Sequence, residues 1–172
     1  MTRVPLVSDE RADDVTREVF AGFQREGREP ISLYRALANA PALLQAYSVL
    51  ARSLRHDADT DRGLRELVIL RTAQLTGSSY AWAHHVPMAT AAGISEAQIA
   101  ALGSFEADAL FDETQRAALR AADAVHALAV DDETYDALAG ALGARGALEV
   151  LMTAAFYASV VRLVQALDLD VE

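Results

Sequence analysis

The chain of 172 residues contains no cysteine. This absence excludes a disulfide framework and any reaction that uses a thiol of this chain as its nucleophile. Glycine and proline are also scarce, at nine and four residues, and alanine and leucine dominate, so the composition favours helix over strand. The sequence has neither a glycine-rich phosphate loop nor the G-x-S-x-G elbow of a serine hydrolase.

Basic charge and long apolar runs are scarce as well. The 15 basic residues face 25 acidic ones, for a net charge of −10, and no basic stripe offsets the repulsion of a phosphate backbone. The most apolar uncharged run, residues 150–161, is too short to cross a bilayer as a helix, and the first residues lack the apolar stretch of a secretory signal. We therefore expect a cytoplasmic protein without nucleic-acid or membrane partners.

The apolar residues that are present follow a helical period. They make up 52% of the chain, enough for a core, and no linker or repeat divides residues 1–172, which predicts a single domain. We expect an all-α antiparallel bundle of seven or eight helices. The expected segments are about 10–27, 32–55 with a new start at Pro41, 60–76, 78–92, 95–103, 112–128, 131–142 and 145–167. The last of these is apolar nearly all round, which predicts a central position or a subunit interface.

Chemistry-bearing side chains gather around two adjacent histidines, His84 and His85. On a helix that begins at Ser78, the side chains of Ser78 and His85 share one face, while Tyr80 and His84 share the adjoining face. The preceding helix carries Glu66 on an otherwise apolar stripe, and Gly77 is placed to end that helix.

A turn at Gly77 makes the two helices antiparallel neighbours. Glu66 and His85 then lie at depths of roughly 16 and 12 Å from the turn, a difference that their side chains can span. We expect the pair to lie within hydrogen-bond reach, directly or through a hydroxyl of Ser78 or Tyr80 or a water, in a pocket walled by Tyr80 or Trp82. A carboxylate and an imidazole in a shielded pocket are the minimum equipment for acid–base catalysis.

Plainer interpretations exist for the same residues. Glu66 could pair with Arg62 one turn earlier or with another surface cation. Tyr80 and Trp82 are more often packing groups than ligand contacts. His84, about 100° around the helix from His85, should point away from Glu66. No H-x-x-x-H spacing with a third ligand occurs, so we expect no metal.

Residues 65–87, from Arg65 through the two histidines to Pro87, resemble the signature of the carboxymuconolactone decarboxylase family, which includes the alkylhydroperoxidase D proteins. The resemblance extends to residues 30–50, 91–96 and 155–168. It implies an alkylhydroperoxidase D-like helical bundle and a homo-oligomer, a trimer or a hexamer.

In the peroxidase branch of that family, a glutamate is followed 12 residues later by C-x-x-C-x-x-x-H. Counting from Glu66 places Ser78 and Ala81 at the two cysteine positions and His85 at the histidine. Because both cysteines are replaced, the peroxidase activity does not transfer. The decarboxylase branch works without redox cysteines, and the resemblance to it implies that no cofactor is required.

These observations give two hypotheses. The first is a cofactor-free acid–base enzyme (a decarboxylase, isomerase or related lyase) acting on a small organic acid or lactone. Its catalytic residues would be Glu66, His85 and Ser78, and its substrate-binding residues Tyr80, Trp82 and His84. The alternative is a non-catalytic ligand-binding or assembly protein derived from a cysteine-dependent alkylhydroperoxidase. Residual redox chemistry would require a thiol from a partner.

Overall fold

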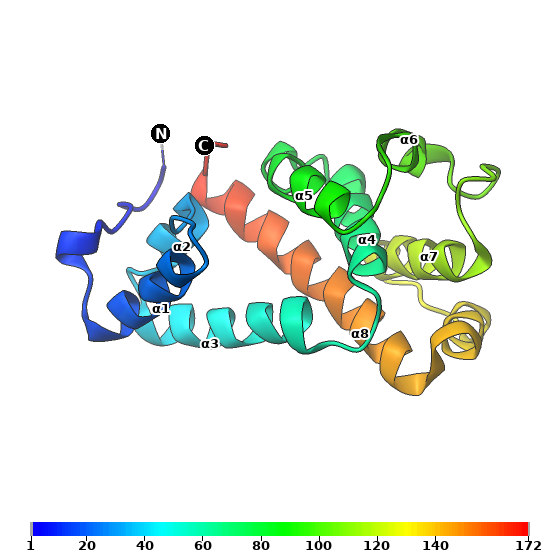
Figure 1. Cartoon of the computed structure of the whole chain (residues 1–172), viewed down its shortest axis with the longest axis horizontal. Helices are drawn as coiled ribbons and strands as arrows, with labels where there is room; N and C mark the ends of the chain where they lie inside the picture. Colours follow the sequence, from blue (N-terminus) through cyan, green and yellow to red (C-terminus); the bar gives the residue numbers. More distant parts are fainter. Residues whose placement is uncertain (1, 172) are drawn as a thin grey trace. The chain divides into compact units, whose positions relative to one another are not determined.

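The computed structural model describes residues 2–171 and contains, within that range, eight α-helices and no β-strand (Figure 1). The helices in chain order are α1 (Asp14–Arg25), α2 (Ser32–Leu37), α3 (Pro41–Arg52), α4 (Arg62–Thr76), α5 (Ser79–Ala91), α6 (Glu96–Ala101), α7 (Glu113–Ala127) and α8 (Asp132–Leu167). The expected all-α class and number of helices are confirmed.

The described chain forms two units, residues 2–57 with 164–171 and residues 58–163. In the first unit, α1 packs on α3 around a core of aromatic and aliphatic side chains. Phe23 meets the ring of Tyr34 edge-on, with centroids 4.5 Å apart. A single domain over the whole chain stays a prediction.

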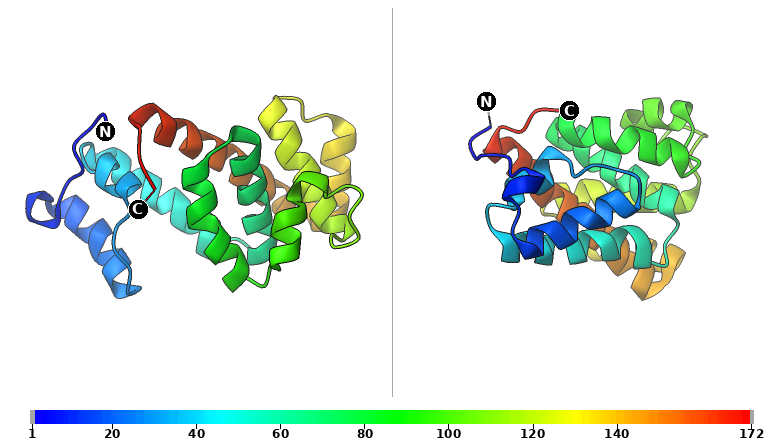
Figure 2. Two further views of the ribbon diagram at one scale, coloured as in Figure 1. Left: turned by 90° about the horizontal axis from the view of Figure 1, so that it is seen from above. Right: turned by 60° about the vertical axis from the view of Figure 1, so that its left-hand side comes forward.

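The second unit is built around α4, which forms an antiparallel hairpin with α5 (Figures 1 and 2). One side of α4 packs its Leu64 and Val68 against alanines of α7 and α8. The other side packs Leu67 and Leu70 against α5 and the segment that leads to α7. Every residue from 63 to 70 is buried, so α4 is the central helix of this unit.

The helix ends follow the expected local chemistry. Pro41 opens α3, and Gly77 ends α4 in the left-handed conformation, with φ at 64°. The hydroxyl of Ser78 caps α5, and Ser95 and Gln98 form the capping box that opens α6. These local features fix the hairpin that carries the candidate site.

Of the two expectations for the last helix, a central position is not observed, and a subunit interface stays a prediction. Two of its large apolar side chains are exposed, Leu148 at 67% and Met152 at 41%. Gly143, with φ at 71°, interrupts α8, so that it comprises the two helical segments expected from the sequence. The central position is taken by α4, whose residues 63–70 are all buried.

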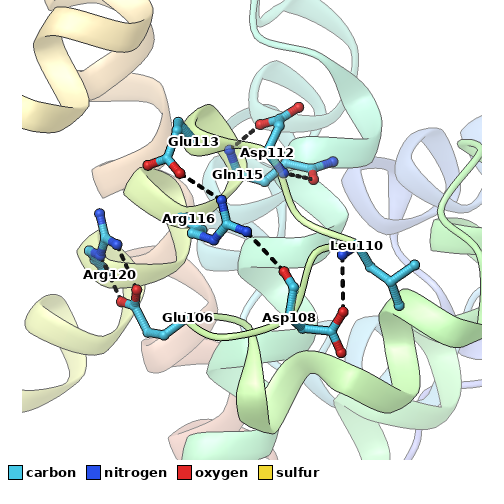
Figure 3. Close-up of polar contacts among 8 residues, drawn as sticks. All are labelled: Glu106, Asp108, Leu110, Asp112, Glu113, Gln115, Arg116 and Arg120. Atoms are coloured by element: carbon cyan, nitrogen blue, oxygen red, sulfur yellow. Dashed lines mark hydrogen bonds and ion pairs between the residues drawn. The ribbon is translucent and has the colours of Figure 1, made fainter.

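The segment between α6 and α7 closes the second side of the core through polar contacts (Figure 3). Arg116 donates to the carbonyl of Asp108, and Arg120 forms a bidentate pair with Glu106. Asp112 and Gln115 form the capping box that opens α7. Together these contacts hold the phenylalanines at 105 and 111 in the core.

One helix, α8, is long and apolar enough to cross a membrane by length and composition alone. Of its most apolar 18-residue window, 56% is buried inside the protein, as in the core helix of a folded unit. The absence of a membrane partner stays a prediction.

Candidate functional site

The hairpin of α4 and α5 brings Glu66 and His85 together. Glu66 is completely buried, at 0% exposure, and His85 is 7% exposed. Their side chains meet directly, with Nδ1 of His85 2.7 Å from Oε2 of Glu66. The expected contact is present, and because it is direct, no relay through Ser78 or Tyr80 is needed.

The other oxygen of Glu66 is also engaged. Oε1 accepts a hydrogen bond from Nη2 of Arg62, one turn earlier on α4. The side chain of Arg62 is 31% exposed and its guanidinium also lies against the sulfur of Met88 on α5. The pairing that offered a plainer interpretation of Glu66 therefore coexists with the contact to His85, and the carboxylate lies between two nitrogen donors.

This geometry constrains the protons of the imidazole. An ionised carboxylate can only accept hydrogen bonds, so at a 2.7 Å separation Nδ1 of His85 is the donor. In the neutral ring, the free electron pair then resides on Nε2. The arrangement leaves one imidazole nitrogen able to take up a proton while the other holds the ring in place.

Tyr157 of α8 completes the surroundings of the imidazole. Its ring meets the ring of His85 edge-on, at 4.8 Å between centroids and an interplanar angle of 88°. Tyr157 is buried, and Phe156 packs edge-on against it in turn. Sequence reasoning missed this residue, because it lies on a helix far along the chain and no local spacing connects it to His85.

The other expected site residues take different places on α5. The hydroxyl of Ser78 accepts the backbone N–H of Ala81 at 3.2 Å as the helix cap. Tyr80 is buried and its ring lies 4.5 Å from that of His84, on the face adjoining His85. Trp82 is half-buried and packs on Ala73, Ala81 and Val161. Roles in catalysis or substrate binding for these residues, and a pocket walled by Tyr80 or Trp82, stay predictions.

A buried polar network anchors the start of α4, where Arg62 lies. Arg65 donates to the carbonyl oxygen and the hydroxyl of Thr60. Burial and the neighbouring charge of Arg62 lower the pKa of Arg65, while nearby carboxylates oppose the shift. Glu149 of α8 accepts the backbone N–H groups of Asp59 and Thr60 at 3.1 and 2.9 Å.

Glu149 thus holds the two residues that precede Asp61, the N-cap of α4, from a distant helix. Burial opposes its charge, but the donors at Thr60 and Asp59 and the guanidinium of Arg145 outweigh that effect and lower its pKa to about 2. No local spacing predicts this contact, because the two residues are 90 positions apart. Among residues 2–171, no three His, Asp or Glu side chains are close enough to hold a metal ion.

The fold and this site define an all-α protein of the alkylhydroperoxidase D-like type, with a buried carboxylate–imidazole pair in a two-helix hairpin. The model of the carboxymuconolactone decarboxylase family matches residues 41–124, a range that includes the pair. Over these residues the chain is similar to that family, but it lacks both motif cysteines. No curated protein matches the sequence.

Solved structures share the fold at low sequence identity. The debrominase Bmp8 without ligand has a TM-score of 0.85 and 23% identity, over 100% of this chain and 93% of that chain. A Bmp8 variant with a cysteine replaced by alanine, in complex with 2,3,4-tribromopyrrole, gives the same score and identity over 100% and 92%. The alkylhydroperoxidase AhpD core of an uncharacterized peroxidase-related protein from Ralstonia eutropha JMP134 has a TM-score of 0.85 and 19% identity, over 99% and 92%.

Proposed function

We propose that this chain is a cofactor-free acid–base enzyme, a decarboxylase, isomerase or related lyase, that acts on a small organic acid or lactone. One observation carries the proposal. Glu66, fully buried, holds Nδ1 of His85 on one oxygen and Arg62 on the other. A buried carboxylate that orients an imidazole is the arrangement that general acid–base catalysis uses.

In this proposal His85 moves the proton and Glu66 keeps the ring in the required tautomer. For an isomerisation, Nε2 accepts a proton from a carbon next to a carbonyl, and the electron pair moves into an enolate. The resulting imidazolium then returns the proton to a different carbon. Glu66 stays ionised throughout and stabilises the transient positive charge of the ring.

In a decarboxylation the same groups act, but His85 begins protonated and donates a proton. The bond between the substrate carbon and its carboxylate breaks, CO₂ leaves, and the electron pair moves into the unsaturated lactone. The protonated His85 then delivers its Nε2 proton to that system. Arg62 does not exchange protons at neutral pH, so its part is to offset the charge of Glu66.

The comparisons support catalysis on a small molecule in this fold. Bmp8 is called a debrominase, and a variant with one cysteine replaced by alanine is found with a tribrominated pyrrole. In this chain Ser78 and Ala81 stand at the motif cysteine positions, so a thiol-dependent version of that chemistry is outside the proposal.

The test is a solvent-exchange assay with the pure protein in D₂O, followed by proton NMR. The probes are carboxymuconolactone and simple unsaturated lactones bearing a carboxylate. Wild-type protein is expected to release CO₂ or shift the double bond and to leave deuterium at the protonated carbon. His85→Asn and Glu66→Gln should lower the rate by about 10²- to 10⁴-fold.

His126→Asn is the matched control, because His126 lies near the end of α7 and outside the site. It should keep the wild-type rate. Turnover that survives His85→Asn would refute the proposal.

The alternative is a ligand-binding or assembly protein derived from a cysteine-dependent alkylhydroperoxidase. The loss of both motif cysteines, with Ser78 and Ala81 in their places, favours it, because the thiol chemistry of the alkylhydroperoxidases cannot operate here. Saturation-transfer NMR with the same lactones and with 2,3,4-tribromopyrrole separates the two functions. Binding without chemical change in either the wild type or His85→Asn would establish the alternative.

A further inference from the structure

The first unit contains a cleft that has no part in the Glu66–His85 site. Its volume is about 240 Å³, and all its lining residues lie between Val15 and His56. Most of its lining residues belong to α1, to α3 and to the turn that follows α3. The helices α1 and α3 pack on each other in this unit. Apolar side chains line part of it, among them Val19, Phe23 and Val49.

Arginines also line the cleft. There are four of them, with His56 and only two carboxylates, Glu18 and Glu26. The local excess of positive charge runs against the net charge of −10 of the whole chain. An apolar surface with unbalanced positive charge on its border matches a ligand that has an apolar body and an anionic group.

The four arginines differ in the hydrogen bonds and ion pairs that they form. Arg28 is paired with Glu26 and lies over the ring of Phe23, and Arg55 reaches the hydroxyl of Tyr34 at 3.3 Å. Arg25 and Arg52 have neither a hydrogen bond nor an ion pair with any side chain among residues 2–171. Two guanidiniums are thus available on the border of the cleft.

The positive charges at the cleft also change the pKa of one of its own carboxyl groups, that of Glu26. The hydrogen bond from Arg28 lowers the pKa of Glu26, burial opposes this, and the charges of His56 and Arg55 add to the lowering. An incoming carboxylate at the same border would experience the same field.

We propose that this cleft binds a small aromatic carboxylate, with its carboxylate on Arg25 and Arg52 and its ring against Phe23 and Val49. A guanidinium offers two parallel N–H donors that match the two oxygens of a carboxylate. The volume of about 240 Å³ accommodates one or two fused rings. Phe23 and Val49 both line the cleft and supply apolar contacts for the rings.

The test is titration of the full chain with 2-naphthoate and with its neutral counterpart 2-naphthamide, followed by ¹⁵N-resolved NMR. Naphthoate is expected to shift the amide signals of α1 and α3 and to bind at least about tenfold more tightly than naphthamide. Added salt should weaken the binding of naphthoate and leave the binding of naphthamide unchanged.

The double variant Arg25→Gln/Arg52→Gln should bind naphthoate at least about tenfold more weakly. Arg11→Gln/Arg162→Gln removes the same charge from exposed positions outside the cleft and should stay within about twofold of wild type. His85→Asn should bind as the wild type does, which separates this cleft from the proposed acid–base function. Three results would overturn the proposal. Naphthoate and naphthamide could bind equally well, Arg25→Gln/Arg52→Gln could bind naphthoate as tightly as wild type, or the amide shifts could be confined to α4 and α5.

Discussion

Glu66 is a fully buried carboxylate whose two oxygens both contact nitrogen donors. It rests between Arg62 and His85. Removing one member of a buried charged group leaves its partner uncompensated, and this loss typically exceeds the net stabilisation that the intact group provides.

Glu66→Gln should therefore lower the free energy of unfolding by about 2 to 4 kcal/mol, because Arg62 and the buried His85 both lose the carboxylate that lies between them. Urea denaturation at pH 7 measures this. Glu133→Gln, at an exposed position in the first turn of α8, should change stability by less than about 0.5 kcal/mol. Equal stabilities of wild type and Glu66→Gln would contradict a net stabilising role of this carboxylate.

The pairing of Glu66 with His85 could be predicted from the sequence, because one turn at Gly77 and the rise of a helix determine it. The simultaneous engagement of Arg62 could be named only as an alternative. Tyr157 could not be predicted at all, because its contact with His85 depends on where α8 packs and not on local spacing.

The chain should be inactive as a thiol peroxidase, because no cysteine exists to form a sulfenate or disulfide. Peroxide consumption with a dithiol reductant should stay at background. Restoring both motif residues, as Ser78→Cys/Ala81→Cys, should give a disulfide after peroxide treatment, seen by mass spectrometry as the loss of two hydrogen atoms.

The physical reason is that positions 78 and 81 adjoin each other at the start of α5, as the bond from Ala81 N–H to the Ser78 hydroxyl demonstrates. Ser79→Cys/Ala81→Cys places two cysteines two residues apart on different faces and should not form the intramolecular bond. Peroxidase turnover by the wild-type chain would contradict the alignment of Ser78 and Ala81 with the motif.

At the scale of helices, the C-terminal end of α7 is unusual. Leu128 caps it in the left-handed conformation, with φ at 57°, and its side chain is 91% exposed. The Cβ of leucine is sterically strained in this conformation, whereas glycine has no Cβ. Leu128→Gly should raise the free energy of unfolding by about 0.5 to 1 kcal/mol, measured by urea denaturation.

Ala129→Gly serves as the neighbouring control. Ala129 does not have positive φ, so glycine there only adds freedom to the unfolded chain and should be neutral or slightly destabilising. A loss of stability in Leu128→Gly would contradict the left-handed cap.

The hydrogen bonds that Glu149 accepts from Asp59 and Thr60 make the second unit sensitive to acid. The pKa of Glu149, about 2, lies below its ordinary value of 4.5, so its stabilising effect is fully present above about pH 4.5 and is lost as pH falls toward 2. Glu149→Gln should lower the free energy of unfolding at pH 7 by about 1 to 2 kcal/mol, the order of magnitude of hydrogen bonds to a charged group.

The difference in stability between wild type and Glu149→Gln should shrink as pH is lowered from 4.5 toward 2. Urea denaturation over that range gives the profile. Glu133→Gln should show no comparable dependence, because its carboxylate is exposed. A difference that stays constant down to pH 2.5 would show that the effect of Glu149 is not electrostatic.

Most helix boundaries could be predicted, because Pro41, Gly77, Ser95 and Gly143 act through local backbone chemistry. The degree of burial of each helix could not be predicted from the sequence. The sequence of α4 carries Arg65 and Glu66, yet both are buried, because each finds polar partners within the unit. The apolar last helix instead keeps an exposed stripe, since helical periodicity does not reveal which helix the others surround.

At the scale of the whole molecule, that stripe is the main feature of the second unit that lacks a packing partner within it. Leu148 and Met152 lie one turn apart on α8, and Ala155 continues the same face. An exposed row of apolar side chains is typical of an interface between subunits. The resemblance to the family independently implies a trimer or a hexamer.

We expect the protein to form a homo-oligomer with a mass three or six times the 18.4 kDa of the chain. Light scattering coupled to size exclusion at micromolar concentration measures this mass. Leu148→Glu/Met152→Glu should shift the protein toward the monomer, because it places a charge on each of the two exposed apolar side chains that an isologous or cyclic interface would bury. Leu128→Asn is the matched control, because Leu128 is more exposed than either but lies outside the stripe, so its replacement should leave the oligomer intact. A wild-type chain that stays monomeric at this concentration would contradict the prediction, and an oligomer that tolerates both glutamates would place the interface elsewhere.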